Sequence, residues 1–192
     1  MFSSRLWNLF IDSFPKMFIR GLTVTIPLTA IAFSLAMVIA VIVALVQFAN
    51  IKVLKQICRF YIWIFRGTPL LVQLFIVFFG LMNVGLVLEP FLAAVIVFAL
   101  NEGAYGAETV RASLESVPSG QLEAGQCAGL SYLQTIFRIV LPQAMRTAFP
   151  SLFNALISML KDTSLAATIT VTEMFKVSQQ IVARTYEPLL LV

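Results

Sequence analysis

Long apolar runs alternate with short polar segments along this chain. No charged residue occurs between Gly21 and Ile51, or between Gly67 and Leu88. Each run exceeds the ~20 residues that an α-helix needs to cross the ~30 Å hydrocarbon core of a bilayer. A secretory signal peptide has a shorter apolar region and a small-residue cleavage site, so the first run is interpreted as a retained span. The pattern therefore predicts an all-α integral membrane protein.

The apolar runs predict a helical bundle of about five spans, the last of them cut short. Four spans are expected at residues 22–48, 60–82, from 91 onward, and from 146 to about 172. Residues 1–20 mix aromatic and basic side chains, which is typical of an interfacial amphipathic lead-in. Residues 188–192 are too few to span a bilayer. We therefore expect a single permease-like transmembrane domain over residues 1–192 that is incomplete at its C-terminus.

Polar residues interrupt three of the expected spans. Residues 66–69 (RGTP) divide the second span. The third reaches the far side only if Glu102 and Glu108 face protein or water. The fourth carries Lys161 and Asp162, and a polar turn is expected at residues 176–187.

Basic residues suggest an orientation. Residues 52–59 contain three basic residues and no acid, whereas residues 83–90 contain no basic residue. The positive-inside rule then puts the first loop in the cytoplasm and the N-terminus outside. Three basic residues in the N-terminal lead-in oppose this assignment, so the polar segment described next decides it.

Residues 113–142 form a polar island between two apolar runs. Pro118 suits the first turn of a helix, which is expected to run from about Ser119 to Gly129, a suitable residue just past a helix end. Ser131 stands three residues before Gln134, a capping-box spacing that starts a second helix toward Leu141. Two short helices joined by a sharp turn predict a compact docking surface. The alternative is an interfacial hairpin without a partner.

Composition excludes several classes of function. Hydrophobic residues make up 60% of the chain, charged residues 11%, and histidine is absent. Cys58 and Cys127 have no metal-ligand spacing, so neither a zinc site nor a histidine-based catalytic triad is expected. The net charge of +4 gives no support to nucleic-acid binding. Because no Gly-x-x-x-x-Gly-Lys-[Ser/Thr] motif occurs, we expect no ATP or other cofactor on this chain.

The polar island also carries a spaced motif. Residues 123–129 read EAGQCAG, nine residues separate Gly129 from Ile139, and Leu141-Pro142 follows. This pattern resembles the EAA loop of bacterial ABC importer permeases of type I, which fits a groove on a cytoplasmic ATPase. Gly125 stands where that family usually has Ala. The resemblance implies that the coupling residues are Glu123, Ala124, Gly125, Gly129, Ile139, Leu141 and Pro142.

Four further segments resemble the permeases of polar amino-acid importers, the histidine, glutamate, glutamine and arginine type. They are residues 21–25 (GLTVT), 65–73 (FRGTPLLVQ), 101–108 (NEGAYGAE) and 161–165 (KDTSL). A zwitterionic cargo needs acids for its ammonium group and N–H or hydroxyl donors for its carboxylate. The candidate substrate-binding residues are Thr68, Pro69, Gln73, Asn101, Glu102, Asp162 and Ser164.

Each intramembrane candidate also has a structural interpretation. Glu102 can pair with an internal base, and Arg66 can pair or snorkel near the cytoplasmic interface. Lys161 and Asp162 can form a salt bridge with each other at a broken helix. Gly103 and Gly106 are expected to serve close packing between helices.

These features together predict a permease subunit of an ATP-driven polar amino-acid importer in the bacterial inner membrane, not an enzyme. The resemblance implies a second permease, an external substrate-binding protein and a cytoplasmic dimer of ATP-binding subunits that holds ATP and Mg. Alternatives are an ABC permease for another small polar solute and an ion-coupled secondary carrier. The carrier would usually show repeated halves, which are not evident. The sequence leaves open which amino acid is carried and whether the partner permease is identical.

Overall fold

The computed structural model describes residues 4–49 and 51–187, and every regular element in these ranges is helical. This confirms the all-α class. The expected apolar tail at residues 188–192 lies outside the described residues.

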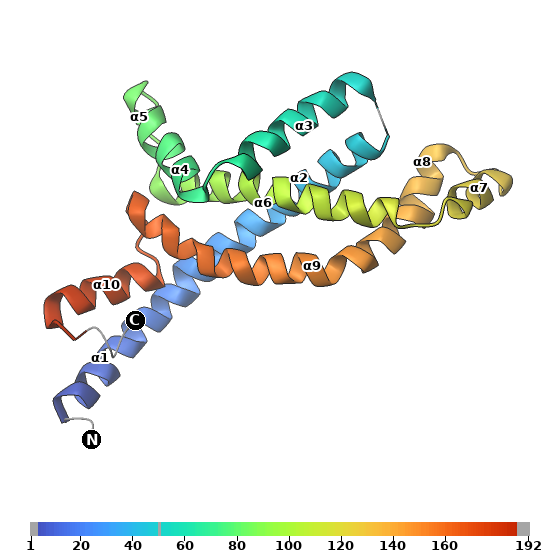
Figure 1. Cartoon of the computed structure of the whole chain (residues 1–192). Helices are drawn as coiled ribbons and strands as arrows, with labels where there is room; N and C mark the ends of the chain where they lie inside the picture. The colour runs from blue at the N-terminus through green and yellow to red at the C-terminus, as the bar shows by residue number, and fades with distance from the viewer. Residues whose placement is uncertain (1–3, 50, 188–192) are drawn as a thin grey trace. The chain divides into compact units, whose positions relative to one another are not determined.

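The first span and its lead-in form one continuous helix (Figure 1). It consists of α1 (Ser4–Arg20), the π-helical η1 (Gly21–Thr25) and α2 (Ile26–Phe48). Leu6–Phe48 has 43 residues, about twice the ~20 needed to cross a bilayer. The lead-in is therefore continuous with the span, and the backbone stays helical past Pro15, Gly21 and Pro27.

The second span is broken where the sequence predicted it. Helix α3 (Lys52–Gly67) ends before Thr68 and Pro69, and α4 (Leu70–Phe75), η2 (Ile76–Gly80) and α5 (Leu81–Asn83) follow. A residue before proline is driven toward extended backbone, and Thr68 has φ −122° and ψ 142°. However, α3 begins at Lys52 and not near residue 60. The basic residues expected in a loop therefore lie on a helix.

The third span is the single helix α6 (Pro90–Glu115), which continues past Asn101 and Glu102. After it come α7 (Gly120–Cys127), α8 (Tyr132–Thr135), the π-helical η3 (Ile136–Val140) and α9 (Leu141–Asp162). The last three join without a break. The expectation of a second short helix ending near Leu141 was thus wrong. Pro142 lies in the first turn of α9, where proline is tolerated, and the helix continues past Pro150 to Asp162.

The fourth span ends earlier than expected. The α-helix gives way at Asp162 to the 3₁₀ helix η4 (Thr163–Ile169), and Thr170 closes that helix in the left-handed region at φ 70°. Lys161 and Asp162 therefore occupy the last turn of α9. The polar turn expected at residues 176–187 is mostly helix α10 (Met174–Thr185).

Two helices in the described ranges, Leu6–Phe48 and Pro90–Glu115, are long and apolar enough to cross a membrane. The broken pair Lys52–Gly67 and Leu70–Asn83 makes a third if it is counted as one span. Helix α9 is not among them by length and composition. A total of five spans stays a prediction.

The described residues group into two compact units. One comprises residues 4–32, 70–97 and 158–187, and the other residues 33–49, 51–69 and 98–157. In the first unit α1 packs against α10 and α4 against η4. Glu173 caps α10 there, since its carboxylate accepts hydrogen bonds from the backbone N–H groups of Phe175 and Lys176.

Small residues form the helix contacts of the second unit. Ala36, Ala40 and Ala44 recur every fourth residue on α2 and are fully buried. A Cβ added at Gly106 would meet the Cβ of Ala40 at 3.0 Å, and one added at Gly103 would meet Ile39 Cγ2 at 2.8 Å. The backbones of α2 and α6 thus approach closely, as small residues allow in membranes. This confirms the close-packing interpretation of both glycines.

Gly103→Ala is expected to destabilise the protein, because the added methyl group forces Ile39 and the Tyr61 hydroxyl to move. Overpacking of this kind typically costs about 1–3 kcal/mol. The control is Gly80→Ala, whose nearest neighbour would lie at an ordinary 3.9 Å. Thermal melting of the purified protein in detergent should show a lower Tm for the first variant alone. Equal Tm values would contradict the close approach.

Candidate functional site

The polar island folds as two capped helices. At the end of α7 the N–H of Leu130 bonds to the carbonyl of Gly125 at 3.0 Å, and that of Gly129 bonds to Gln126 at 2.9 Å. Gly129 has φ +76°. This is a Schellman motif, in which glycine avoids the steric cost of left-handed backbone. The helix starts at Gly120 with Ser119 as its N-cap, so Pro118 lies just before it and not in its first turn.

The second helix begins at the predicted capping box. The Ser131 hydroxyl accepts from the Gln134 N–H at 3.3 Å, and the Gln134 side chain accepts from the Ser131 N–H at 2.9 Å. The two caps leave only Gly129 and Leu130 between them in the turn. The chain direction at the tip of the polar island is thus fixed by backbone hydrogen bonds.

Gly125 and Thr135 lock the two helices together. Both residues are buried. A Cβ at residue 125 would overlap Thr135 Cγ2 and would lie only 2.6 Å from its Oγ1 and 3.0 Å from its Cβ. Thr135 is held in turn, since its hydroxyl donates to the Ser131 carbonyl at 3.1 Å. Glycine at residue 125 is therefore required by this packing.

The motif residues divide into an outward and an inward set. Glu123, Ala124, Gly129 and Pro142 are exposed. Ile139 is half-buried, and Leu141 packs against a core cluster that includes Val110 and Leu114 of α6. The outward set can contact a partner, while the inward set attaches the polar island to the helices of its own unit.

The candidate substrate residues fall into both compact units. In one, the Asn101 side chain donates to the Phe65 carbonyl at 3.2 Å, and the Thr68 hydroxyl donates to the Ile64 carbonyl at 2.8 Å. Pro69 is exposed and Glu102 is half-buried in the same unit. Asn101 therefore ties α6 to the end of α3, directly before the break in the second span.

The remaining candidates belong to the other unit. Gln73 is buried on α4, and Asp162 is exposed at the end of α9. Ser164 lines a mostly apolar cavity of about 440 Å³, together with Lys161 and Glu173. Glu173 is only 2% exposed. The pKa of its carboxyl group is raised, because the effect of burial outweighs that of its two backbone hydrogen bonds, which lower it.

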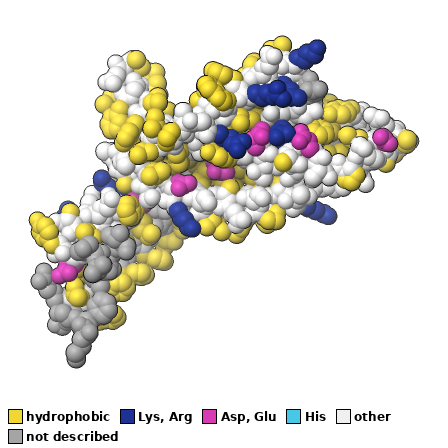
Figure 2. Space-filling model, viewed as in Figure 1, with side chains coloured by type: hydrophobic (Ala, Val, Ile, Leu, Met, Phe, Trp, Pro, Cys, Tyr) yellow, Lys and Arg dark blue, Asp and Glu magenta, His cyan; other side chains and the backbone are white. Residues whose placement is uncertain are grey.

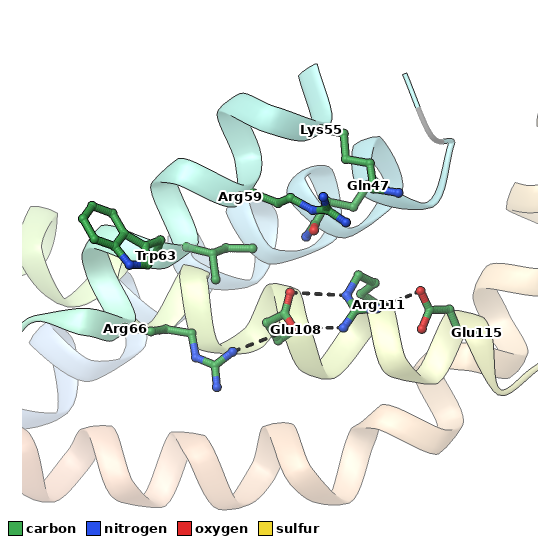
Figure 3. Close-up of a pocket in the computed structure, with 9 residues that line it drawn as sticks. Gln47, Lys55, Arg59, Trp63, Arg66, Glu108, Arg111 and Glu115 are labelled. Carbon is green, nitrogen blue, oxygen red and sulfur yellow. Dashed lines mark hydrogen bonds and ion pairs between the residues drawn. The ribbon is translucent and has the colours of Figure 1, made fainter. Parts of the chain in front are cut away.

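Three charged residues, Glu108, Arg111 and Glu115, form a row on α6 (Figure 3). The sequence analysis did not identify them as a group. Glu108 accepts from Arg111 at 2.9 and 3.3 Å and lies 3.8 Å from Arg66, while Arg111 also donates to Glu115 at 2.7 Å. The Arg66 guanidinium lies 5.1 Å from the centre of the Tyr105 ring. The spacing of 108, 111 and 115 was the available signal, since residues three and four apart share a helix face. Glu108 thus faces protein, and the pairing interpretation of Arg66 is confirmed.

Comparisons with known proteins agree on one kind of protein. Residues 36–190 match the family described as binding-protein-dependent transport system inner membrane component. The chain is 45% identical over 186 residues to the L-cystine transport system permease protein TcyB of Bacillus subtilis, with 97% of this chain and 80% of TcyB covered. It is 37% identical over 191 residues to the nopaline transport system permease protein NocM of Agrobacterium fabrum, with 94% and 79% covered.

Solved structures give the same result. A chain from a crystal structure of an amino acid ABC transporter with histidines superimposes with a TM-score of 0.82 at 33% identity, covering 92% of this chain and 83% of that one. A chain of the inward-facing MetNI methionine ABC transporter gives a TM-score of 0.71 at 18% identity, covering 99% and 88%. Because the identity to the MetNI chain is only 18%, this similarity shows a shared fold and nothing further.

Gly125→Ala is expected to destabilise the polar island by about 1–3 kcal/mol through overpacking against Thr135. Gly120→Ala on the same helix is the control, because nothing lies within 4 Å of its added Cβ. Hydrogen exchange of the amides in residues 120–135 should accelerate in the first variant only.

The double variant Gly125→Ala/Thr135→Ala tests the contact itself. Removing Oγ1 and Cγ2 makes room for the new methyl group, so the two substitutions should be non-additive by roughly 1 kcal/mol or more, as expected for residues in contact. Additive effects would show that Thr135 is not what excludes a side chain at residue 125.

Proposed function

Because the chain belongs to the family of inner-membrane components of binding-protein-dependent transport systems, we propose that it is the permease subunit of an ATP-driven amino-acid importer. Membership makes it a transport subunit of the bacterial inner membrane and not an enzyme. Relatives named as permeases for L-cystine, nopaline, octopine and arginine support an amino-acid cargo. The observation that carries the proposal is the geometry of the polar island. Its two short helices form a compact knob, residues 120–135, that exposes several of the motif residues.

Coupling follows from how the knob is built. A partner ATPase subunit would hold ATP and Mg and would bind the outward residues, with Glu123 facing a basic groove. The two caps and the Gly125–Thr135 contact would keep the knob from deforming when the ATPase subunit moves against it. Its second helix runs without a break into α9, the fourth expected span, so a displacement of the polar island would be passed to that helix. A ligand-driven change of this kind requires different contacts in the two states, and the knob–groove interface supplies them.

The cargo would be recognised by opposite charges at its two ends. Glu102 and Asp162 are the groups for its ammonium, and backbone N–H groups near the break at Thr68 and Pro69 are those for its carboxylate. Arg66 would act on the carboxylate only at longer range, since its guanidinium pairs with Glu108 and lies over the Tyr105 ring. Asn101 is a further candidate in the unit that holds Glu102, and Gln73 and Ser164 are further candidates in the unit that holds Asp162.

The assembly would contain two permeases, two ATP-binding subunits and an external substrate-binding protein. The N-terminus would lie outside and the polar island in the cytoplasm, since only there can an ATPase reach it. Exposed apolar side chains along α2 and α3, such as Ile42 and Phe60, agree with contact to lipid or to a second permease.

Glu123→Arg should abolish ATP-dependent uptake while the protein still inserts and melts normally. Placing a base opposite a basic groove costs several kcal/mol, which corresponds to a loss of association of roughly a hundredfold or more. Uptake into proteoliposomes and co-purification of the ATPase subunit are the measurements. The control is Gln56→Arg, an exposed residue of α3. Full uptake by Glu123→Arg would refute the docking role.

Glu102→Gln and Asp162→Asn should each lower amino-acid uptake by roughly tenfold or more, because a charge-assisted hydrogen bond to the ammonium is lost. Binding of the cargo by the external protein should not change. The matched control is Asp12→Asn, which removes the same charge from an exposed pair with Lys16. If both variants transport at the normal rate with normal substrate stimulation of ATP hydrolysis, these acids are structural.

A further inference from the structure

An apolar groove of about 180 Å³ lies beside the polar island, in the second compact unit. The end of α2 and Ile51 form one side of it, and α8 and η3 form the other. Every residue that lines the groove is apolar or aromatic, and none is a proposed coupling or substrate residue. Figure 2 shows hydrophobic side chains gathered in this region, between the end of α2 and the polar island.

The floor of the groove belongs to the packed core, but its rim is exposed. Ile136 is buried and belongs to a core cluster with residues of α2 and α6. Leu133 is 65% exposed and Phe137 55%, and Tyr132 and Ile51 are exposed as well. Residues 132, 133, 136 and 137 share one helix face, since residues three and four apart are neighbours there. Exposed apolar surface of this kind marks a site of contact.

The groove lies at the level of the polar island and not along the apolar part of α9. The Gln143 side chain donates to that of Gln121 on α7 at 3.4 Å, so the helix is still beside the polar island at residue 143. Phe137 is about 9 Å further from the expected span, at 1.5 Å per residue. Arg138 and Arg146 are exposed on the same stretch, and exposed bases are costly in lipid. Lipid tails therefore do not account for the apolar rim.

The rim continues the surface proposed to receive the ATP-binding subunit. Gly129 and Ser131 are exposed at the tip of the polar island, and the exposed Tyr132 and Leu133 follow them directly on the second helix. A subunit that encloses the tip therefore also meets the rim of the groove. No separate partner is needed to cover this apolar surface.

Two exposed bases flank the groove. Lys52 follows the lining residue Ile51 in the chain, and Arg138 follows the lining residue Phe137. No acid is among the residues that line the groove. A complementary partner segment therefore presents an apolar side chain with carboxylates next to it.

We infer that an apolar side chain of the ATP-binding subunit inserts into this groove, with acidic neighbours that face Lys52 and Arg138. The inference rests on the proposed coupling role and adds a second contact to it. A buried apolar anchor in a formed pocket carries a large share of the binding energy of an interface. Charges at the edge of the pocket mainly steer the encounter and fix its register.

Titration of the ATP-binding subunit onto the permease in nanodiscs tests the groove. Phe137→Ala and Leu133→Ser should each raise the Kd roughly tenfold or more, since each removes apolar surface around the inserted side chain. The matched control is Phe153→Ala, because Phe153 is 51% exposed on the continuation of the same helix but does not line the groove. Arg138→Gln should raise the Kd at low salt and have less effect at high salt, as expected for a charge at the rim.

Glu123→Arg separates the failure of this inference from that of the proposed function. If it weakens binding while Phe137→Ala and Leu133→Ser bind as tightly as the wild type, the coupling role stands and the groove contact is overturned. If the wild-type permease does not bind the ATP-binding subunit at all, both are overturned. An equal loss of affinity in Phe153→Ala would also overturn the groove contact, because the effect would not be specific to it.

A nitroxide label on Leu133→Cys, with Cys58 and Cys127 replaced by serine, tests lipid as the occupant. Collisions with a water-soluble nickel reagent should be frequent in the permease alone and should become rare when the ATP-binding subunit binds. Collisions with oxygen that exceed those with nickel, whether or not the subunit is bound, would show that lipid fills the groove and would overturn the inference.

Discussion

The uninterrupted helix from the Ser131 cap to Asp162 is the feature on which the proposed coupling depends, because it connects the polar island to the fourth expected span. The polar island protrudes as a turn of two helices, but only its first helix ends within it. The second becomes α8, η3 and α9 in succession, so the residues at the tip and those of the fourth expected span lie on one continuous helix. The Gly125–Thr135 contact packs the first helix against the start of this one. In the proposed coupling, that contact would link a displacement at Glu123 to the second helix.

Polar side chains along the apolar helices are stabilised by ion pairs and hydrogen bonds with one another. Glu108, Arg111 and Glu115 neutralise one another along one face of α6, and Arg66 joins them from α3. Asn101 and Tyr61 hydrogen-bond across the same two helices. Such groups are costly in lipid unless they have partners. The pairs therefore join α3 to α6 near the break in the second span, while the small residues of α2 and α6 allow those two helices to approach closely.

Features encoded by neighbouring residues could be predicted from the sequence. The Schellman turn at Gly129, the capping box at Ser131 and the break before Pro69 each depend on a few consecutive residues, and all three are confirmed. Helix ends that depend on distant packing could not be predicted. The start of α3 at Lys52 and the continuation past Leu141 involve basic and polar residues that pattern reading assigns to loops. The charged cavity lined by Gln47 was beyond reach for the same reason, because three helices must pack before its lining residues converge.

Gly125 shows how a departure from a family pattern acquires meaning only in three dimensions. As a sequence feature it is a missing methyl group at one motif position, with the spacing intact. In the structure that methyl group would collide with Thr135, ten residues later on the facing helix. The volume that alanine would occupy at residue 125 is therefore filled from the other side by the threonine side chain, whose hydroxyl also bonds to the capping residue Ser131. The glycine and the threonine thus form one packing unit, and neither can be judged alone as a conservative or a disruptive change.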